Sequence, residues 1–153
     1  VIKAEKFDGP FSCLMHDFFI TKNHALFLFL PLTFNYERIQ QGQSMLMWEP
    51  DLGAHIAIIP RHGNAKDIIW INTDSFHAYH YMNAYEENNK IMLDAMKSPQ
   101  ANLFPDKSGK IPSLRENYPR LTRFTFDLQQ KKLSEIQLDA TPSEFPRFDE
   151  RFT

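Results

Sequence analysis

Cysteine, glycine and long apolar runs are scarce in this sequence of 153 residues, and each scarcity excludes a class of protein. Cys13 is the only cysteine, so no intrachain disulfide framework can form, which fits a reducing compartment. The longest apolar stretch, residues 25–32, has eight residues. That is far short of the roughly 20 residues that a membrane-spanning helix needs, so no such helix is expected.

An excess of charge of one sign is also missing. The 17 Lys and Arg side chains nearly balance the 19 Asp and Glu side chains, and the formal net charge is −2. The chain therefore offers no electrostatic reason to expect nucleic acid or an anionic membrane surface as a partner. Aromatic residues, by contrast, are abundant: 14 Phe, 5 Tyr and 2 Trp supply a sizeable core, which excludes a disordered chain.

Short segments rich in Ile, Leu and Phe, bounded by turn residues, predict strands rather than helices. No window shows a sustained 3.6-residue period, and the only helix candidates are weak turns at residues 34–41 and 94–100. Residues 97–119 are rich in Pro and predict a long loop, which we call the excursion. Loops of this length are commonly functional or disordered. The predicted strands are residues 14–20, 25–31, 54–61, 67–72, 76–86, 90–95, 121–128 and 133–140.

These strands repeat at an interval of 64 residues. His16, His80 and Glu144 are spaced by this interval, and each histidine heads a group of four predicted strands. A recurring four-strand unit is typical of a β-propeller, although two equal spacings alone can arise by chance. A propeller needs at least about four blades to close, so we interpret the all-β chain as a partial arc of a larger one. The predicted units are residues 11–74, 75–140 and 141–153.

The six histidines are the candidates for metal chemistry. His77 and His80 are three residues apart, which on a strand points them to opposite sides, so this pair is not expected to hold one ion. We assign plain structural or solvated roles to His24, His55, His62 and His77.

Five short strings surround the remaining two histidines and Glu144. The family strings that they match are MHDF-x-IT-x-N, W-x-P-x-x-G, IPR-x-G, FH-x-x-NA(Y/F/W)E(E/D) and EFPR. In this order they make the chain resemble the carotenoid cleavage oxygenases, which include lignostilbene dioxygenases and the retinoid isomerohydrolase. The resemblance covers nearly the whole chain and is weakest over residues 97–119. The strings here are MHDFFITKN at 15–23, WEPDLG at 48–53, IPRHG at 59–63, YHYMNAYEE at 79–87 and EFPR at 144–147.

This resemblance implies a seven-bladed propeller with one Fe(II) on its axis, bound by four histidines from different blades. His16 and His80 match two of the four ligands. Glu144 matches one of three carboxylates that orient the ligands, and we expect it to accept the ring N–H of His80. The other ligands lie outside this chain, so the segment alone is expected to be inactive and to self-associate through its open sheet edges. Candidates for lining the substrate tunnel are Phe18, Tyr81 and Tyr85.

The family reaction adds O₂ across one C=C bond of a conjugated apolar substrate, an apocarotenoid or a stilbene, and releases two carbonyl products. We expect this Fe(II)-dependent dioxygenase activity of the intact protein. Two alternatives stay open: a retinoid isomerase or isomerohydrolase on the same fold, and a metal-free propeller scaffold. The polar loop at residues 33–44 slightly favours a smaller substrate. We expect a cytoplasmic location, with peripheral contact with a membrane left open.

Overall fold

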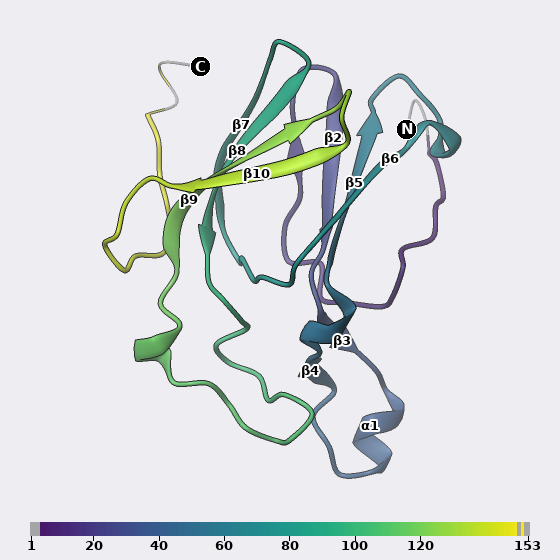
Figure 1. Ribbon diagram of the computed structural model, residues 1–153. Coiled ribbons are helices and arrows are strands. Elements are labelled where there is room, and N and C mark those ends of the chain that lie inside the picture. The colour runs from purple at the N-terminus through teal and green to yellow at the C-terminus, as the bar shows by residue number, and fades with distance from the viewer. Residues whose placement is uncertain (1–3, 150, 152–153) are drawn as a thin grey trace.

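Two four-stranded antiparallel sheets dominate the computed structural model, which describes residues 4–149 and 151 (Figure 1). Each sheet is a meander whose strands follow one another in chain order, apart from one inserted arm. The all-β prediction is confirmed, and so is the four-strand unit. The first sheet has the order β1 (Phe19–Ile20), β2 (His24–Phe29), β5 (Ala54–Pro60) and β6 (Ile69–Thr73). The second has the order β7 (Tyr81–Glu87), β8 (Lys90–Lys97), β9 (Arg120–Asp127) and β10 (Lys132–Gln137).

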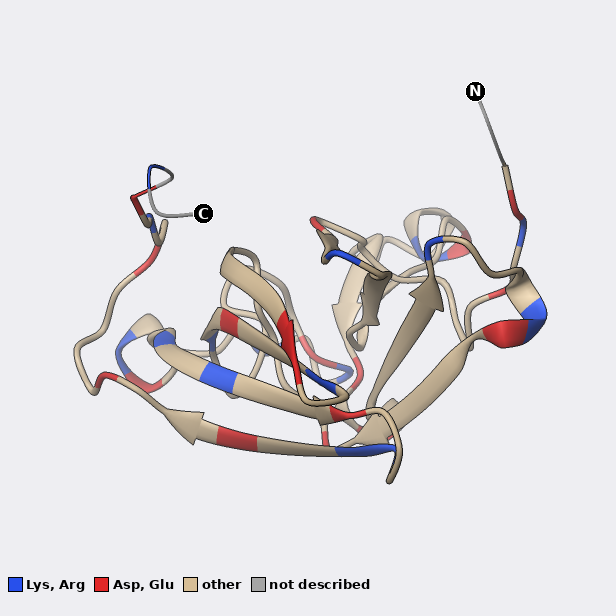
Figure 2. Cartoon of the chain, turned by 90° about the horizontal axis from the view of Figure 1, so that it is seen from above, with Lys and Arg blue, Asp and Glu red and all other residues tan. Residues whose placement is uncertain are grey.

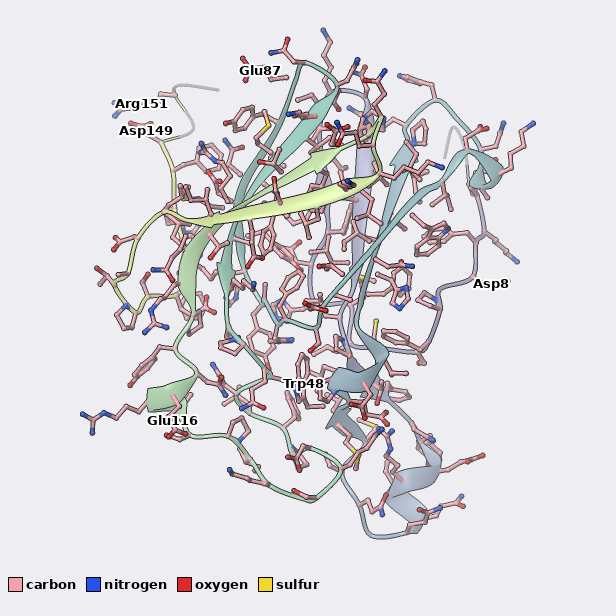
Figure 3. The ribbon with its side chains drawn as sticks, viewed as in Figure 1. Asp8, Trp48, Glu87, Glu116, Asp149 and Arg151 are labelled. Carbon is pink, nitrogen blue, oxygen red and sulfur yellow. The ribbon has the colours of Figure 1, made fainter. Side chains whose placement is uncertain are left out.

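An arm and the excursion after β8 project from the same end of the two sheets (Figure 1). The arm pairs β3 (Leu32–Phe34) with β4 (Leu46–Trp48) around the short helix α1 (Glu37–Gln40). Trp48, seen at the junction of arm and sheets in Figure 3, donates its backbone N–H to the carbonyl of Pro105 at 2.8 Å. The excursion is therefore tied to the arm. Three single turns of 3₁₀ helix complete the elements: Pro50–Leu52, Ala65–Asp67 and Leu114–Glu116.

One apolar core lies between the two sheets. In β9 the side chains alternate, so that Phe124 and Phe126 are buried while the residues between them are half-buried. Full burial of a Leu, Ile or Phe side chain contributes about 1.5–3 kcal/mol, so this shared face holds the two sheets together. The fully buried side chains of this core include Leu26, Ile56, Ile58, Ile71, Ile91 and Leu93.

A polar contact fastens the start of the second sheet to the first. The carboxylate of Glu86, on β7, accepts hydrogen bonds from the Thr21 hydroxyl, from the backbone N–H of Asn23 at 2.9 Å and from its side-chain amide at 2.7 Å. Nδ1 of His24 lies 3.1 Å from the same carboxylate. Burial opposes ionisation of Glu86, but these hydrogen bonds outweigh it and lower its pKa to about 2. We call this cluster of Thr21, Asn23, His24 and Glu86 the inter-sheet clamp.

Two of the predicted element positions are wrong. The helical turn expected at residues 94–100 is absent, and residues 94–97 are instead the end of β8. This strand pairs with β7 through residues 90–95 and with β9 through residues 90–97. The strand expected at residues 14–20 is reduced to Phe19–Ile20. The preceding segment pairs with β3 instead, since the Leu14 N–H donates to the Leu32 carbonyl at 2.9 Å. In both places, pairing with a distant strand overrides the local pattern.

Other strand positions also differ from the prediction. The strand expected at residues 76–86 begins only at Tyr81, after a bridge between His77 and Ser98. Residues 144–148 form no strand, although a third group of strands was expected to open there. The turn predicted at residues 34–41 is confirmed by α1.

Lys and Arg residues are mixed with Asp and Glu residues along the chain. Figure 2 shows acidic and basic residues interspersed along the ribbon, as the small net charge suggests. Within the described residues, no helix is long and apolar enough to cross a membrane.

Candidate metal site

His16 and His80 pack edge to face at the end of the sheets where each first strand begins. Their ring centroids are 5.3 Å apart and the ring planes are inclined by 85°. His16 lies three residues before β1, and His80 immediately precedes β7. Two segments at equivalent places in the two sheets therefore bring these imidazoles together.

Glu144 reaches His80 from the C-terminal segment. Oε2 of Glu144 lies 2.8 Å from Nδ1 of His80, and the backbone N–H of Phe145 donates to the same oxygen at 3.0 Å. An ionised carboxylate only accepts hydrogen bonds, so Nδ1 of His80 carries the proton in this contact. Nε2 then keeps its lone pair, which is the tautomer that a metal-binding imidazole requires.

A cavity of about 590 Å³ lies beside these three residues, all of which line it. Its volume is in the range of about 300–1,000 Å³ that small-molecule sites occupy. Most of the exposed wall is apolar, and much of it comes from the long excursion and the C-terminal segment. The excursion predicted from the Pro-rich stretch therefore forms part of the cavity wall. Its apolar wall includes Leu103, Leu114, Pro142 and Phe145.

Buried polar groups around this cavity lack hydrogen-bond partners in the part of the chain that the structure describes. They include both ring nitrogens of His77, the hydroxyl of Tyr79 and Oδ1 of Asn102. The ring of Tyr79 packs against His77 at 4.2 Å and against His16 at 5.5 Å between centroids. Burial, aided by the nearby His16, lowers the pKa of His77 to about 4, so this imidazole is neutral at pH 7. Burial also raises the pKa of the Tyr79 hydroxyl.

The three residues predicted to line a tunnel do not line this cavity. Phe18 is exposed and stacks on Phe27, with ring centroids 5.3 Å apart. Tyr81 packs against Phe19 at 4.2 Å, and burial raises the pKa of its hydroxyl. Tyr85 lies beneath the guanidinium of Arg123 at 5.8 Å. These three side chains contact Phe27, Phe19 and Arg123 instead of the residues that line the cavity.

The two imidazoles suit a divalent transition metal. Nitrogen ligands favour iron, zinc, copper or nickel over calcium and magnesium. A metal–nitrogen bond is about 2.1 Å long, so two rings with centroids 5.3 Å apart can both reach one ion. No group of three or more His, Cys, Asp or Glu side chains that could hold a metal occurs within residues 4–149 and 151. The described residues thus bring together two imidazoles and one carboxylate that is hydrogen-bonded to one of them.

Among the cavity residues that sequence reasoning missed, Tyr79 and Phe145 belong to the matched strings. Tyr79 precedes His80 and stands where the family string has Phe, and Phe145 follows Glu144 in the EFPR string. Both residues lie within the strings that match the family, and this was the sequence signal that could have identified them. Leu103 and Leu114 carried no such signal, because the resemblance is weakest in the excursion.

Comparisons with known proteins identify the family of the chain. A family model described as "Retinal pigment epithelial membrane protein" matches residues 2–153. The chain belongs to this family.

Its relatives include an isoeugenol monooxygenase of Pseudomonas putida, 36% identical over 149 residues that cover 95% of this chain and 31% of that protein. Among solved structures, a lignostilbene dioxygenase of Pseudomonas brassicacearum superposes with a TM-score of 0.86 at 32% identity, covering 94% of this chain and 31% of the other. A cobalt-substituted ACO of Synechocystis gives a TM-score of 0.70 at 29% identity, covering 88% and 29%.

The chain spans about a third of the length of these relatives. The predicted fold, a partial arc of a β-propeller, is confirmed by the two four-stranded sheets together with these structural neighbours.

Proposed function

We propose that the protein containing this segment is a non-haem Fe(II) oxygenase that cleaves one C=C bond of a conjugated, largely apolar substrate. The reaction consumes one O₂ and converts R–CH=CH–R′ into the two carbonyl compounds RCHO and R′CHO. One observation carries the proposal: His16 and His80 meet across two sheets, and Glu144 holds the Nδ1 of His80. The oxygenase names of the relatives support the same reaction class.

Each residue has a defined part in this proposal. His16 and His80 would bind the iron through ring nitrogens, and Glu144 keeps the Nδ1 proton of His80 in place, which also raises the basicity of Nε2. When bound, the iron supplies the activation of O₂. The apolar wall, including Leu103 and Leu114, would hold the conjugated part of the substrate and exclude water.

The test uses protein of the relatives' full length that contains this segment, loaded with Fe(II) under anaerobic conditions. A hydroxystilbene, isoeugenol and an apocarotenal are then supplied separately with ¹⁸O₂, and products are identified by mass. We expect two carbonyl products from at least one of them, with one O₂ consumed per bond cleaved. Isomerised or hydrolysed product without O₂ uptake would instead indicate the isomerohydrolase reaction.

Two matched histidine variants test the ligand assignment. His80→Ala is expected to lose both bound iron and activity, because it removes a ligand. His62→Ala removes an exposed histidine of a turn and is expected to retain both. Iron bound equally by wild type and His80→Ala would refute the assignment of His80 as a ligand. A wild-type protein that binds no iron would instead favour the metal-free scaffold.

We also propose a cytoplasmic location, which the single cysteine supports because a reducing compartment needs no disulfides. Fractionation of cells that express the full protein tests this. Recovery in the membrane fraction that high salt or carbonate releases would indicate peripheral attachment instead.

A further inference from the structure

Phe145 holds a backbone conformation that is unusual for an aromatic residue. Its φ is +56°, in the left-handed region that side chains with a Cβ rarely adopt. The next residue, Pro146, disfavours the right-handed helical region for Phe145 but leaves extended conformations open. The left-handed conformation is therefore one that contacts of Phe145 must stabilise.

Burial among the described residues does not explain this conformation, because Phe145 is 73% exposed in this chain. Its ring lies instead against the imidazole of His80, with centroids 4.4 Å apart and planes inclined by 38°. The same ring forms part of the cavity wall. The side chain therefore faces the candidate metal site rather than the interior of the sheets.

The backbone of Phe145 acts on the same histidine. Its N–H donates to Oε2 of Glu144 at 3.0 Å, and this oxygen lies 2.8 Å from Nδ1 of His80. The ring contact and the backbone hydrogen bond thus converge on His80 from two directions. A single hydrogen bond at Nδ1 restrains one edge of the imidazole and leaves the ring free to tilt, whereas a ring against its face limits that tilt.

We propose that Phe145 is a positioning residue that sets the plane of the His80 imidazole, and hence the direction of the Nε2 lone pair. The strained backbone is then the conformation that places both the ring and the N–H of Phe145 at His80. This inference rests on the proposed function, since His80 is assigned there as an iron ligand.

The experiment compares four variants of the full-length protein that contains this segment. Phe145→Leu keeps an apolar side chain without a planar ring, and Phe145→Tyr keeps the ring. Phe145→Gly removes the ring and also the backbone strain. Phe148→Leu is the matched control, because Phe148 is an exposed aromatic residue three positions further on. Three quantities are measured: Fe(II) affinity against a chromogenic chelator, the Co(II) ligand-field spectrum, and the melting temperature of the metal-free protein.

We expect Phe145→Leu and Phe145→Gly to bind iron about tenfold more weakly and to shift the Co(II) bands, as changes to groups that orient a ligand do. Phe145→Tyr should restore wild-type affinity and spectrum, and Phe148→Leu should leave both unchanged. The metal-free Phe145→Gly protein should melt no lower than wild type, which separates positioning from a general loss of structure.

Wild-type affinity and spectrum in both Phe145→Leu and Phe145→Gly would overturn the proposal. So would a loss in Phe145→Tyr as large as that in Phe145→Leu, because the ring would then not be the active feature. A wild-type protein that binds no iron would instead overturn the proposed function, and this inference with it.

Discussion

Replacing Glu86 by Gln is expected to weaken the inter-sheet clamp without changing the shape of the side chain. The carboxylate accepts hydrogen bonds from Thr21 and from two N–H groups of Asn23, and it lies beside Nδ1 of His24. An amide presents an NH₂ group in place of one oxygen, so it cannot accept from all of these donors. The variant also removes the negative charge that the hydrogen bonds stabilise.

The magnitude follows from the ionisation of Glu86. Its pKa falls from 4.5 to about 2, and one pKa unit corresponds to about 1.4 kcal/mol, which gives roughly 3 kcal/mol. The side chain is 18% exposed, so screening by water reduces this contribution to about 2 kcal/mol. Because the pKa is lower in the folded state, the stabilisation is present above pH 4.5 and is lost as the pH falls toward 2.

Urea unfolding of the wild type and of Glu86→Gln at several values between pH 7 and pH 3 measures this effect. Glu87→Gln is the matched control, since Glu87 is the next residue and is exposed at the tip of the hairpin between β7 and β8 (Figure 3). A difference below about 0.5 kcal/mol at pH 7 would refute the reasoning, because surface substitutions commonly cause that much. A difference that does not shrink on acidification would refute the role of the charge.

Three further predictions address other buried or site groups. Asp94→Asn is expected to destabilise the fold by about 2 kcal/mol, because Asp94 is buried and pairs with Arg123 through two contacts of 2.7 and 2.8 Å. Urea unfolding measures this, and an unchanged midpoint would contradict it. The wild type is expected to lose stability as the pH falls from 6.5 to 4, because the unfolded chain takes up a proton on His77 in that range while the folded chain does not. His77→Phe is expected to reduce this loss. Melting temperatures at pH 7 and pH 5 test it, and an equal fall in melting temperature in both proteins would disprove it. Glu144→Gln is expected to lower the iron affinity of the full-length protein about tenfold, since Glu144 orients His80 in the proposed site. The melting temperature of the metal-free form should stay unchanged. A chelator titration that gives wild-type affinity would count against this role.

Strand identity was predictable where the pattern depends only on neighbouring residues. The alternation in residues 121–128 predicted β9, whose Phe124 and Phe126 are buried. The segment before His16 was not predictable in the same way, because its Leu14 N–H pairs with Leu32 across the chain. The apolar residues there fit a strand of the sheet equally well, and only the competing partner decided the outcome.

The site residues, like the strands, were predictable only in part. His16, His80 and Glu144 were identified from the strings and their spacing, and the expected contact between His80 and Glu144 is present at 2.8 Å. The expected tunnel positions Phe18 and Tyr81 followed from proximity in sequence to these histidines. They do not line this cavity, because Phe18 stacks on Phe27 and Tyr81 packs against Phe19.

The sequence by itself determined the class of fold, the four-strand repeat and the identity of the two histidines and one carboxylate, because local periodicity and short strings encode these features. Only the tertiary structure decided the convergence of Glu86 with Thr21, the ordered cavity wall from the excursion and the left-handed conformation of Phe145. Each of these depends on contacts between groups whose closeness is set by how the sheets and connecting segments pack. Such contacts leave no period in the sequence, so they appear only when the chain is folded.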